Sequence, residues 1–195
     1  MTTNQPNSNS LEVELETWNT KWADFALVAD TGEELKCHKI VLAKESEFFD
    51  AMLSSDCKET NTNKMKVPNF SLETVFTFLE YIYAGLKWND HVRHRPYMKD
   101  FDMGKITPEL MKMCHTYQVD GLFQECSYQL SLKVSDNNVV SLWIDAEKCE
   151  AKLLKDRALL HIKRKKKDIA NLPGMEEAFK CQVLMKSLVD FMASI

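Results

Sequence analysis

ELKCHKIVLAKESEFF, residues 34–49, places two polar residues, His38 and Lys39, directly before the apolar run IVLA. The opening letters ELKC alternate charged and apolar side chains, which predicts a short strand. The following residues, HKIVLAKE at 38–45, predict one compact helix. A second helix follows from Ser46, whose hydroxyl can cap the free amide groups at its start. The stretch therefore predicts a strand followed by a helical hairpin.

The segments on either side of this stretch predict a small sheet. The apolar run at 25–29 and the turn residues DTGEE predict a strand that forms a hairpin with residues 34–37. KMKVP, residues 64–68, alternates charged and apolar side chains and ends at a proline, as an edge strand does. Residues 71–85, SLETVFTFLEYIYAG, have helical spacing, a serine cap and a final glycine. The fold class is α+β, with a three-stranded sheet capped by helical hairpins.

The first residues of the chain predict a tail and then a helix. Residues 1–10 are mostly polar and have no period, which predicts a disordered tail. Four apolar residues follow at helical spacing: Leu11, Leu15, Trp18 and Trp22. Such a narrow stripe predicts an amphipathic helix that needs a partner surface.

The second half of the chain predicts helices. Residues 86–106 have no period and form an insertion that is either functional or mobile. Thr107 as cap and Pro108 at the first helical position start a helical pattern that continues to Leu130. Residues 131–195 predict an all-helical segment. Its apolar faces are Val139, Leu142, Trp143 and Ala146, then Ala151, Leu154, Ala158 and Ile162, and finally Cys181, Leu184, Met185, Leu188 and Met192.

Composition excludes several classes of protein. The net charge of −4 argues against a surface built to follow a phosphate backbone, so nucleic acid is not the expected partner. No stretch approaches the ~18 consecutive apolar residues of a membrane span, and the start lacks the pattern of a signal peptide. We therefore expect an intracellular protein of the nucleus, the cytoplasm or both, with no membrane partner. The six scattered cysteines are expected to stay free.

The order of the predicted elements resembles the BTB/POZ domain over residues 11–130. The residues that carry the resemblance are Asp24, His38, Lys39, Leu42, Ala43, Ser46, Phe49, Met52 and the YIYAG ending at 81–85. Residues 131–195 contain a segment, NNVVSLWIDAEKCEAKLLKDRALLHI, that resembles the shortened BACK helices of speckle-type POZ proteins. Those proteins carry a substrate-binding MATH domain ahead of the BTB domain, which we do not expect in the ten residues before Leu11.

The resemblance implies a homodimer, or a dimer with a related BTB protein. The interface residues it implies are Leu11, Leu15, Trp18, Asp24, His38 and Lys39. A partly buried charge at such an interface must be paired, so we expect Asp24 and Lys39 to be partners. Without the resemblance, His38 and Lys39 are first-turn residues whose stems cover apolar surface while their polar ends stay in water.

The resemblance also implies binding to the amino-terminal domain of cullin-3, a ubiquitin-ligase scaffold. Family members use an apolar residue, any residue and a glutamate after the hairpin helices, and Cys57, Lys58 and Glu59 occupy that place. Cys57 is a departure, because a larger apolar residue would bury more area. Tyr117 matches an aromatic residue of the same face. The alternatives are a solvated loop here and, for the whole chain, a cullin-independent oligomerisation scaffold. The adaptor hypothesis requires an unknown protein substrate.

The sequence lacks the usual patterns of catalysis. It has no nucleophile elbow, no phosphate-binding glycine loop and no zinc-protease helix motif, so we expect no enzyme and no cofactor. The spacing of His91, His94, Cys114 and His115 fits no familiar metal site, and we expect no bound metal. The charge run of Lys163, Arg164, Lys165, Lys166 and Lys167 is either a nuclear import signal or a solvated helix end.

Overall fold

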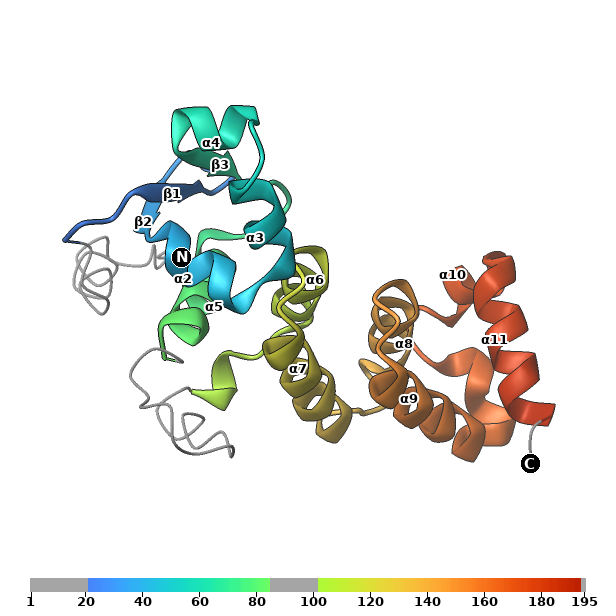
Figure 1. Ribbon diagram of the computed structural model, residues 1–195. Coiled ribbons are helices and arrows are strands. Elements are labelled where there is room, and N and C mark those ends of the chain that lie inside the picture. Colours follow the sequence, from blue (N-terminus) through green and yellow to red (C-terminus); the bar gives the residue numbers. More distant parts are fainter. Residues whose placement is uncertain (1–20, 85–101, 194–195) are drawn as a thin grey trace, which may run out of the picture. The chain divides into compact units, whose positions relative to one another are not determined.

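The computed structural model describes residues 21–84 and 102–193, without the side chains of 166–168. These residues belong to two compact units. Unit 1 contains the residues up to Asp102 together with 117–119, and unit 2 contains 103–116 and the residues from Asp120 onward. The elements of both units are labelled in Figure 1.

A three-stranded mixed sheet forms one layer of unit 1. Strands β1 (Phe25–Val28) and β2 (Glu34–Cys37) pair antiparallel, and β3 (Lys64–Lys66) pairs parallel with β1, giving the order β2-β1-β3. Leu27 lies opposite Leu35 on one side and Met65 on the other, and all three are buried. The predicted hairpin and edge strand are therefore confirmed.

Helices make up the rest of the described part of unit 1. They are α2 (Lys39–Glu45), α3 (Glu47–Leu53), α4 (Lys58–Thr62) and α5 (Leu72–Ala84). Figure 1 shows α2, α3 and α5 gathered on one side of the sheet. The predicted caps are present: the hydroxyl of Ser46 accepts the N–H of Phe49, and that of Ser71 accepts the N–H of Thr74. The α+β fold class is therefore confirmed.

Unit 2 is helical. Its elements are η3 (Met103–Lys105), α6 (Pro108–Thr116), α7 (Asp120–Leu132), α8 (Val139–Lys148), α9 (Lys152–Lys165), η4 (Lys166–Asn171), α10 (Met175–Lys180) and α11 (Gln182–Ala193). The predicted apolar faces of α8 and α9 are all buried, and Trp143 is 0% exposed at the centre of a core shared by α8 to α11. The predicted hairpin of α8 and α9 is thus confirmed.

The structure corrects three predictions in the helical segments. Trp22 lies in a turn with a φ of 76°, outside a helix, because the left-handed conformation interrupts helical hydrogen bonding. Gln118, with a φ of 51°, separates α6 from α7 for the same reason. In the last stripe only Leu184 and Leu188 are buried, since α10 ends at Cys181 in an extended conformation and α11 starts anew.

Two further predictions lie partly outside the described residues. These are the helix that begins at Leu11 and most of the insertion at 86–106. Within the described ranges, no helix is long and apolar enough to cross a membrane.

Candidate interaction surfaces

The start of α2 is capped by residues from elsewhere in unit 1. Its N-cap residue, His38, makes no side-chain cap bond. The backbone N–H of His38 instead donates to the hydroxyl of Tyr83 (2.8 Å), and that of Lys39 donates to Asp24 Oδ1 (2.8 Å). The carboxylate also meets the positive end of the helix dipole. The His-Lys pair therefore marks the point where α2 is held against the residue before β1 and the end of α5.

The imidazole of His38 adds two contacts to this network. Its Nδ1 lies 2.7 Å from the Tyr83 hydroxyl, and its Nε2 lies 3.3 Å from the carbonyl oxygen of Lys21. A carbonyl oxygen can only accept, so the contact with Lys21 assigns a proton to Nε2, and in that tautomer Nδ1 accepts from the Tyr83 hydroxyl. Burial raises the pKa of Tyr83 well above its ordinary value, which keeps the hydroxyl protonated and able to donate.

Within the chain, the ammonium group of Lys39 contacts Asn63 and the ring of Phe25. Nζ donates to Asn63 Oδ1 (2.5 Å) and lies 5.9 Å from the centre of the Phe25 ring. In the part of the chain that the structure describes, no ion pair joins Lys39 to Asp24 within one chain, and their pairing at a dimer interface stays a prediction. Asp24 meets the backbone of Lys39, because a carboxylate can replace the missing cap of α2.

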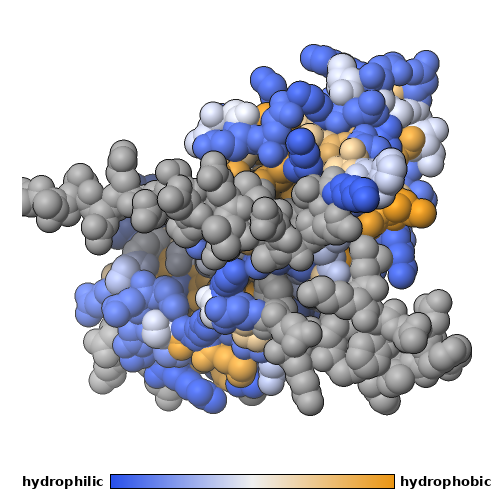
Figure 2. Space-filling model, turned by 90° about the vertical axis from the view of Figure 1, so that its left-hand side faces the viewer, coloured by the Kyte–Doolittle hydropathy of each residue, from blue (hydrophilic) through white to orange (hydrophobic). Residues whose placement is uncertain are grey.

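Two large apolar side chains next to this network face solvent. Ile40, in the first turn of α2, is 79% exposed, and Trp22 is 82% exposed. An open groove of about 390 Å³ lies beside Trp22, with Asp24 and Asn63 in its wall. We call Trp22, Asp24, His38, Lys39 and Ile40 the α2 face. Figure 2 shows how polar most of the coloured surface is in one view of the molecule, with hydrophobic residues in small separate patches.

The segment predicted to meet cullin-3 is a short helix and not only a loop. Cys57 is the N-cap of α4, and Glu59 lies in its first turn; both are half-buried. The thiol lies 3.1 Å from the Thr60 hydroxyl and 3.7 Å from the carbonyl oxygen of Met52. Hydrogen bonding by Thr60 lowers the pKa of Cys57. The helix ends at Asn63, with a φ of 54°, whose side chain holds Lys39. Asn63 thus joins α4 to the α2 face.

Tyr117 is a core residue of unit 1. It is 3% exposed, and its ring contacts those of Phe48, Phe49, Phe70 and Phe78 at centroid distances of 5.3 to 6.2 Å. Its carbonyl accepts the buried hydroxyl of the α3 cap. Burial raises the pKa of Tyr117 to about 12. This burial does not support a direct contact between Tyr117 and a partner protein. That role of Tyr117 stays a prediction.

The basic run begins inside α9 and not after it. Lys165 Nζ pairs with Asp136 Oδ2 (2.5 Å), and Lys163 Nζ lies 5.9 Å from the centre of the Phe191 ring. Arg164 is exposed, and the side chains of Lys166 and Lys167 lie outside the described residues. An import signal at this run stays a prediction.

The described residues contain no candidate cluster of metal ligands. Those residues hold no group of three or more His, Cys, Asp or Glu side chains that could bind a metal ion. Cys114 is buried, and the ring of His115 packs 5.8 Å from that of Phe123. His91 and His94 lie outside the described residues, as do the predicted interface residues Leu11, Leu15 and Trp18.

Sequence reasoning missed two residues of the α2 network. Tyr83 entered the sequence analysis only within the YIYAG ending at 81–85, although a hydroxyl at a helix end is a signal of a polar role. Asn63 is the last residue of the predicted loop, and asparagine is one of the few residues that adopt the left-handed conformation readily. Neither signal identified the partner, because each partner lies 24 or more residues away.

Comparison with known sequences identifies relatives for most of the chain. The profile of the BTB/POZ domain matches residues 14–133. Protein maternal effect lethal 26 of Caenorhabditis elegans is 27% identical over 158 residues, which cover 80% of this chain and 37% of that protein. A BTB/POZ domain-containing protein of Arabidopsis thaliana is 26% identical over 159 residues, which cover 80% of this chain and 60% of that protein. The chain thus spans less than two thirds of the length of these relatives.

Solved structures with a similar fold include the BTB domain of human gigaxonin. It is 21% identical, with a TM-score of 0.40, and the match covers 65% of this chain and 93% of that domain. The BTB domain of zebrafish PATZ1 is 18% identical, with a TM-score of 0.40, over 67% of this chain and 98% of that domain.

Proposed function

The chain belongs to the BTB/POZ family of non-catalytic protein-interaction domains, and from this premise we propose that it forms a homodimer through the α2 face and docks cullin-3. The single observation behind the dimer is the exposure of Ile40 in a helix turn where the N–H groups of His38 and Lys39 are already bonded. These two N–H groups need no further partner, whereas the apolar side chain of Ile40 does. Burial of this apolar surface at an interface therefore leaves few polar groups without a hydrogen bond, so its desolvation cost is small.

Burial of the apolar side chains of the α2 face would favour a symmetric contact. Full burial of one isoleucine side chain contributes roughly 1.5–3 kcal/mol. In a two-fold interface each residue counts twice, so Ile40 and Trp22 together supply four buried side chains. Leu11, Leu15 and Trp18 would add to this surface, as the family resemblance implies.

Light scattering over a dilution series tests the dimer. Ile40→Asp should shift the dimer to monomer and weaken association by at least about tenfold, since a buried carboxylate without a partner is costly. Leu153→Asp is the matched control, because Leu153 is 44% exposed on α9 in unit 2. A wild-type chain that stays monomeric at 100 µM, or an Ile40→Asp dimer as stable as wild type, would contradict the proposal.

The cullin-3 contact would use the start of α4. Glu59 is half-buried in the first turn and carries the charge of the family pattern, and Asn63 couples α4 to the α2 face. In a dimer, two such surfaces would bind with avidity if geometry allows both to engage.

A cullin-independent oligomerisation scaffold is the second candidate, and two observations favour it. The thiol of Cys57 is directed to the Met52 carbonyl and the Thr60 hydroxyl, and Tyr117 is 3% exposed. Neither presents the apolar surface that the cullin contact of the family needs.

Calorimetric titration with the cullin-3 amino-terminal domain separates the two candidates. A dissociation constant near ~1 µM, about −8 kcal/mol, that weakens at least about tenfold in Glu59→Ala supports the adaptor. Glu73→Ala is the matched control, because it removes an exposed carboxylate from the first turn of α5. A folded dimer that shows no binding at tens of micromolar would support the cullin-independent scaffold. A second method that does not depend on heat should confirm that result.

A further inference from the structure

Unit 2 has a basic face on α9 that neither the dimer nor the cullin contact uses. We define the basic face as Arg157, His161, Arg164 and Lys165. The first three follow at spacings of four and three, which places them on one side of the helix. They line a recess of about 160 Å³ together with Ser131, Val134 and Leu160. The recess is open to solvent and mostly polar, and Val134 and Leu160 form the apolar part of its wall.

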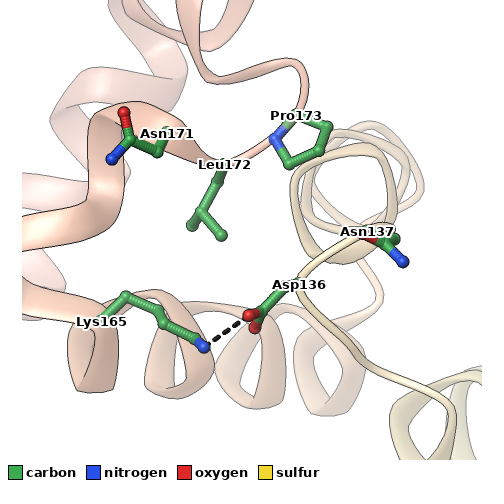
Figure 3. Close-up of a pocket in the computed structure, with 6 residues that line it drawn as sticks. All are labelled: Asp136, Asn137, Lys165, Asn171, Leu172 and Pro173. Atoms are coloured by element: carbon green, nitrogen blue, oxygen red, sulfur yellow. Dashed lines mark hydrogen bonds and ion pairs between the residues drawn. The ribbon is translucent and has the colours of Figure 1, made fainter.

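One carboxylate of the chain already binds to the basic face. Asp136 accepts from His161 Nε2 at Oδ1 (2.7 Å) and from Lys165 Nζ at Oδ2 (2.5 Å), while half of its side chain is exposed. Hydrogen bonds from Lys165 and then His161 lower its pKa. Figure 3 shows Lys165 directed at Asp136 on the wall of a neighbouring pocket, with Leu172 pointing into that pocket. The geometry of the face therefore suits a carboxylate.

Two guanidinium groups of the basic face remain available. Arg157 and Arg164 are exposed, and among the described residues neither makes a hydrogen bond or an ion pair. A guanidinium binds a carboxylate through two parallel hydrogen bonds, which adds geometric specificity to the charge attraction. The net charge of the chain is −4, so attraction of an acidic ligand would have to be local.

We propose that the basic face binds an acidic peptide segment of a partner protein, with an apolar side chain next to its carboxylates. The carboxylates would pair with Arg157 and Arg164, and the apolar side chain would occupy the recess beside Val134 and Leu160. The bound Asp136 and the apolar wall favour such a peptide over a nucleic acid, whose backbone offers phosphates alone. This surface lies in unit 2 and does not depend on dimerisation or on cullin-3.

Fluorescence anisotropy of the full chain tests the proposal. The probe is a fluorescein-labelled eight-residue peptide in which glutamate alternates with leucine and glycine, and its counterpart has glutamine in place of glutamate. The glutamate peptide should bind, and the double variant Arg157→Gln, Arg164→Gln should weaken binding at least about tenfold, which is 1.4 kcal/mol. Circular dichroism confirms that each variant is folded.

Two more variants distinguish a built site from general charge attraction. Lys180→Gln with Lys186→Gln makes the same change in net charge at exposed positions of α10 and α11, and it should alter binding by less than about twofold. Asp136→Asn frees His161 and Lys165 from their internal partner and should tighten binding about threefold or more. A merely structural role for Asp136 does not predict this gain.

Several outcomes would overturn the proposal. They are equal binding of the glutamine peptide, an unchanged affinity in the arginine double variant, and an equal loss in the lysine control. Binding of an oligothymidine in place of the acidic peptide would also overturn it, since it would assign the face to phosphate.

Discussion

Removing one hydroxyl from Tyr83 tests the account of the α2 start. Tyr83→Phe keeps the ring, which packs edge-on against His38 at 5.9 Å, and removes the acceptor of the His38 N–H and the partner of Nδ1. One hydrogen bond contributes about 0.5–1.5 kcal/mol, and a buried donor left unpaired costs about 1–3 kcal/mol. The substitution removes two part-buried hydrogen bonds, so we expect a loss of about 1–3 kcal/mol.

Two measurements check this value. Urea unfolding should give the loss in stability, and hydrogen exchange at the His38 amide should become about 5- to 100-fold faster, since each 1.4 kcal/mol is a factor of ten. Tyr128→Phe is the control, because that residue is 48% exposed and should change stability by less than about 0.5 kcal/mol. A double-mutant cycle with His38→Ala isolates the imidazole contact. If Tyr83→Phe matches Tyr128→Phe in both measurements, the reasoning is refuted.

Three further predictions concern single side chains. Ser46→Ala removes the cap of α3 and the buried bond to the Tyr117 carbonyl, so thermal unfolding should show a loss of about 2–4 kcal/mol, and a loss below 1 kcal/mol would contradict this. Cys57 should react with iodoacetamide at neutral pH far faster than Cys37 in mass spectrometry, because hydrogen bonds lower the pKa of Cys57 while burial raises that of Cys37 to about 12; similar rates would argue otherwise. Hydrogen bonds from Lys165 and His161 lower the pKa of Asp136 in the folded state, so the pairing stabilises the fold fully above about pH 4. This stabilisation is lost as the pH falls through the lowered pKa. Acid titration should therefore destabilise Asp136→Asn less than wild type below about pH 4, and parallel curves would count against the pairing.

Local signals predicted most of the secondary structure. The caps at Ser46, Ser71 and Thr107 each accept an N–H three residues later, so the sequence contains both partners of the bond. The alternation of β2 and the helical spacing of α8 and α9 likewise follow from which side chains must be buried. These predictions depend on near neighbours and were confirmed.

Predictions of continuity were less successful. The helical pattern runs across Gln118 and Cys181, yet the backbone breaks at both. A periodic pattern reports which face is apolar, and it does not report a single residue that adopts a left-handed or extended conformation. For the same reason Tyr117, next to the first break, is buried among four phenylalanines and not on a helix surface.

The sequence by itself predicted that the apolar run at 25–29 forms a hairpin with the alternating residues up to Cys37, that two helices follow, and that the chain resembles the BTB/POZ domain. Only the tertiary structure decided which residues form hydrogen bonds with His38 and Lys39 at the start of α2. Asp24, Asn63 and Tyr83 lie 15, 24 and 45 residues from the groups they bind. Periodicity and capping patterns act within a few residues, because they reflect one helix turn or one strand pleat. A hydrogen bond over a longer separation exists only after packing has brought its two partners together.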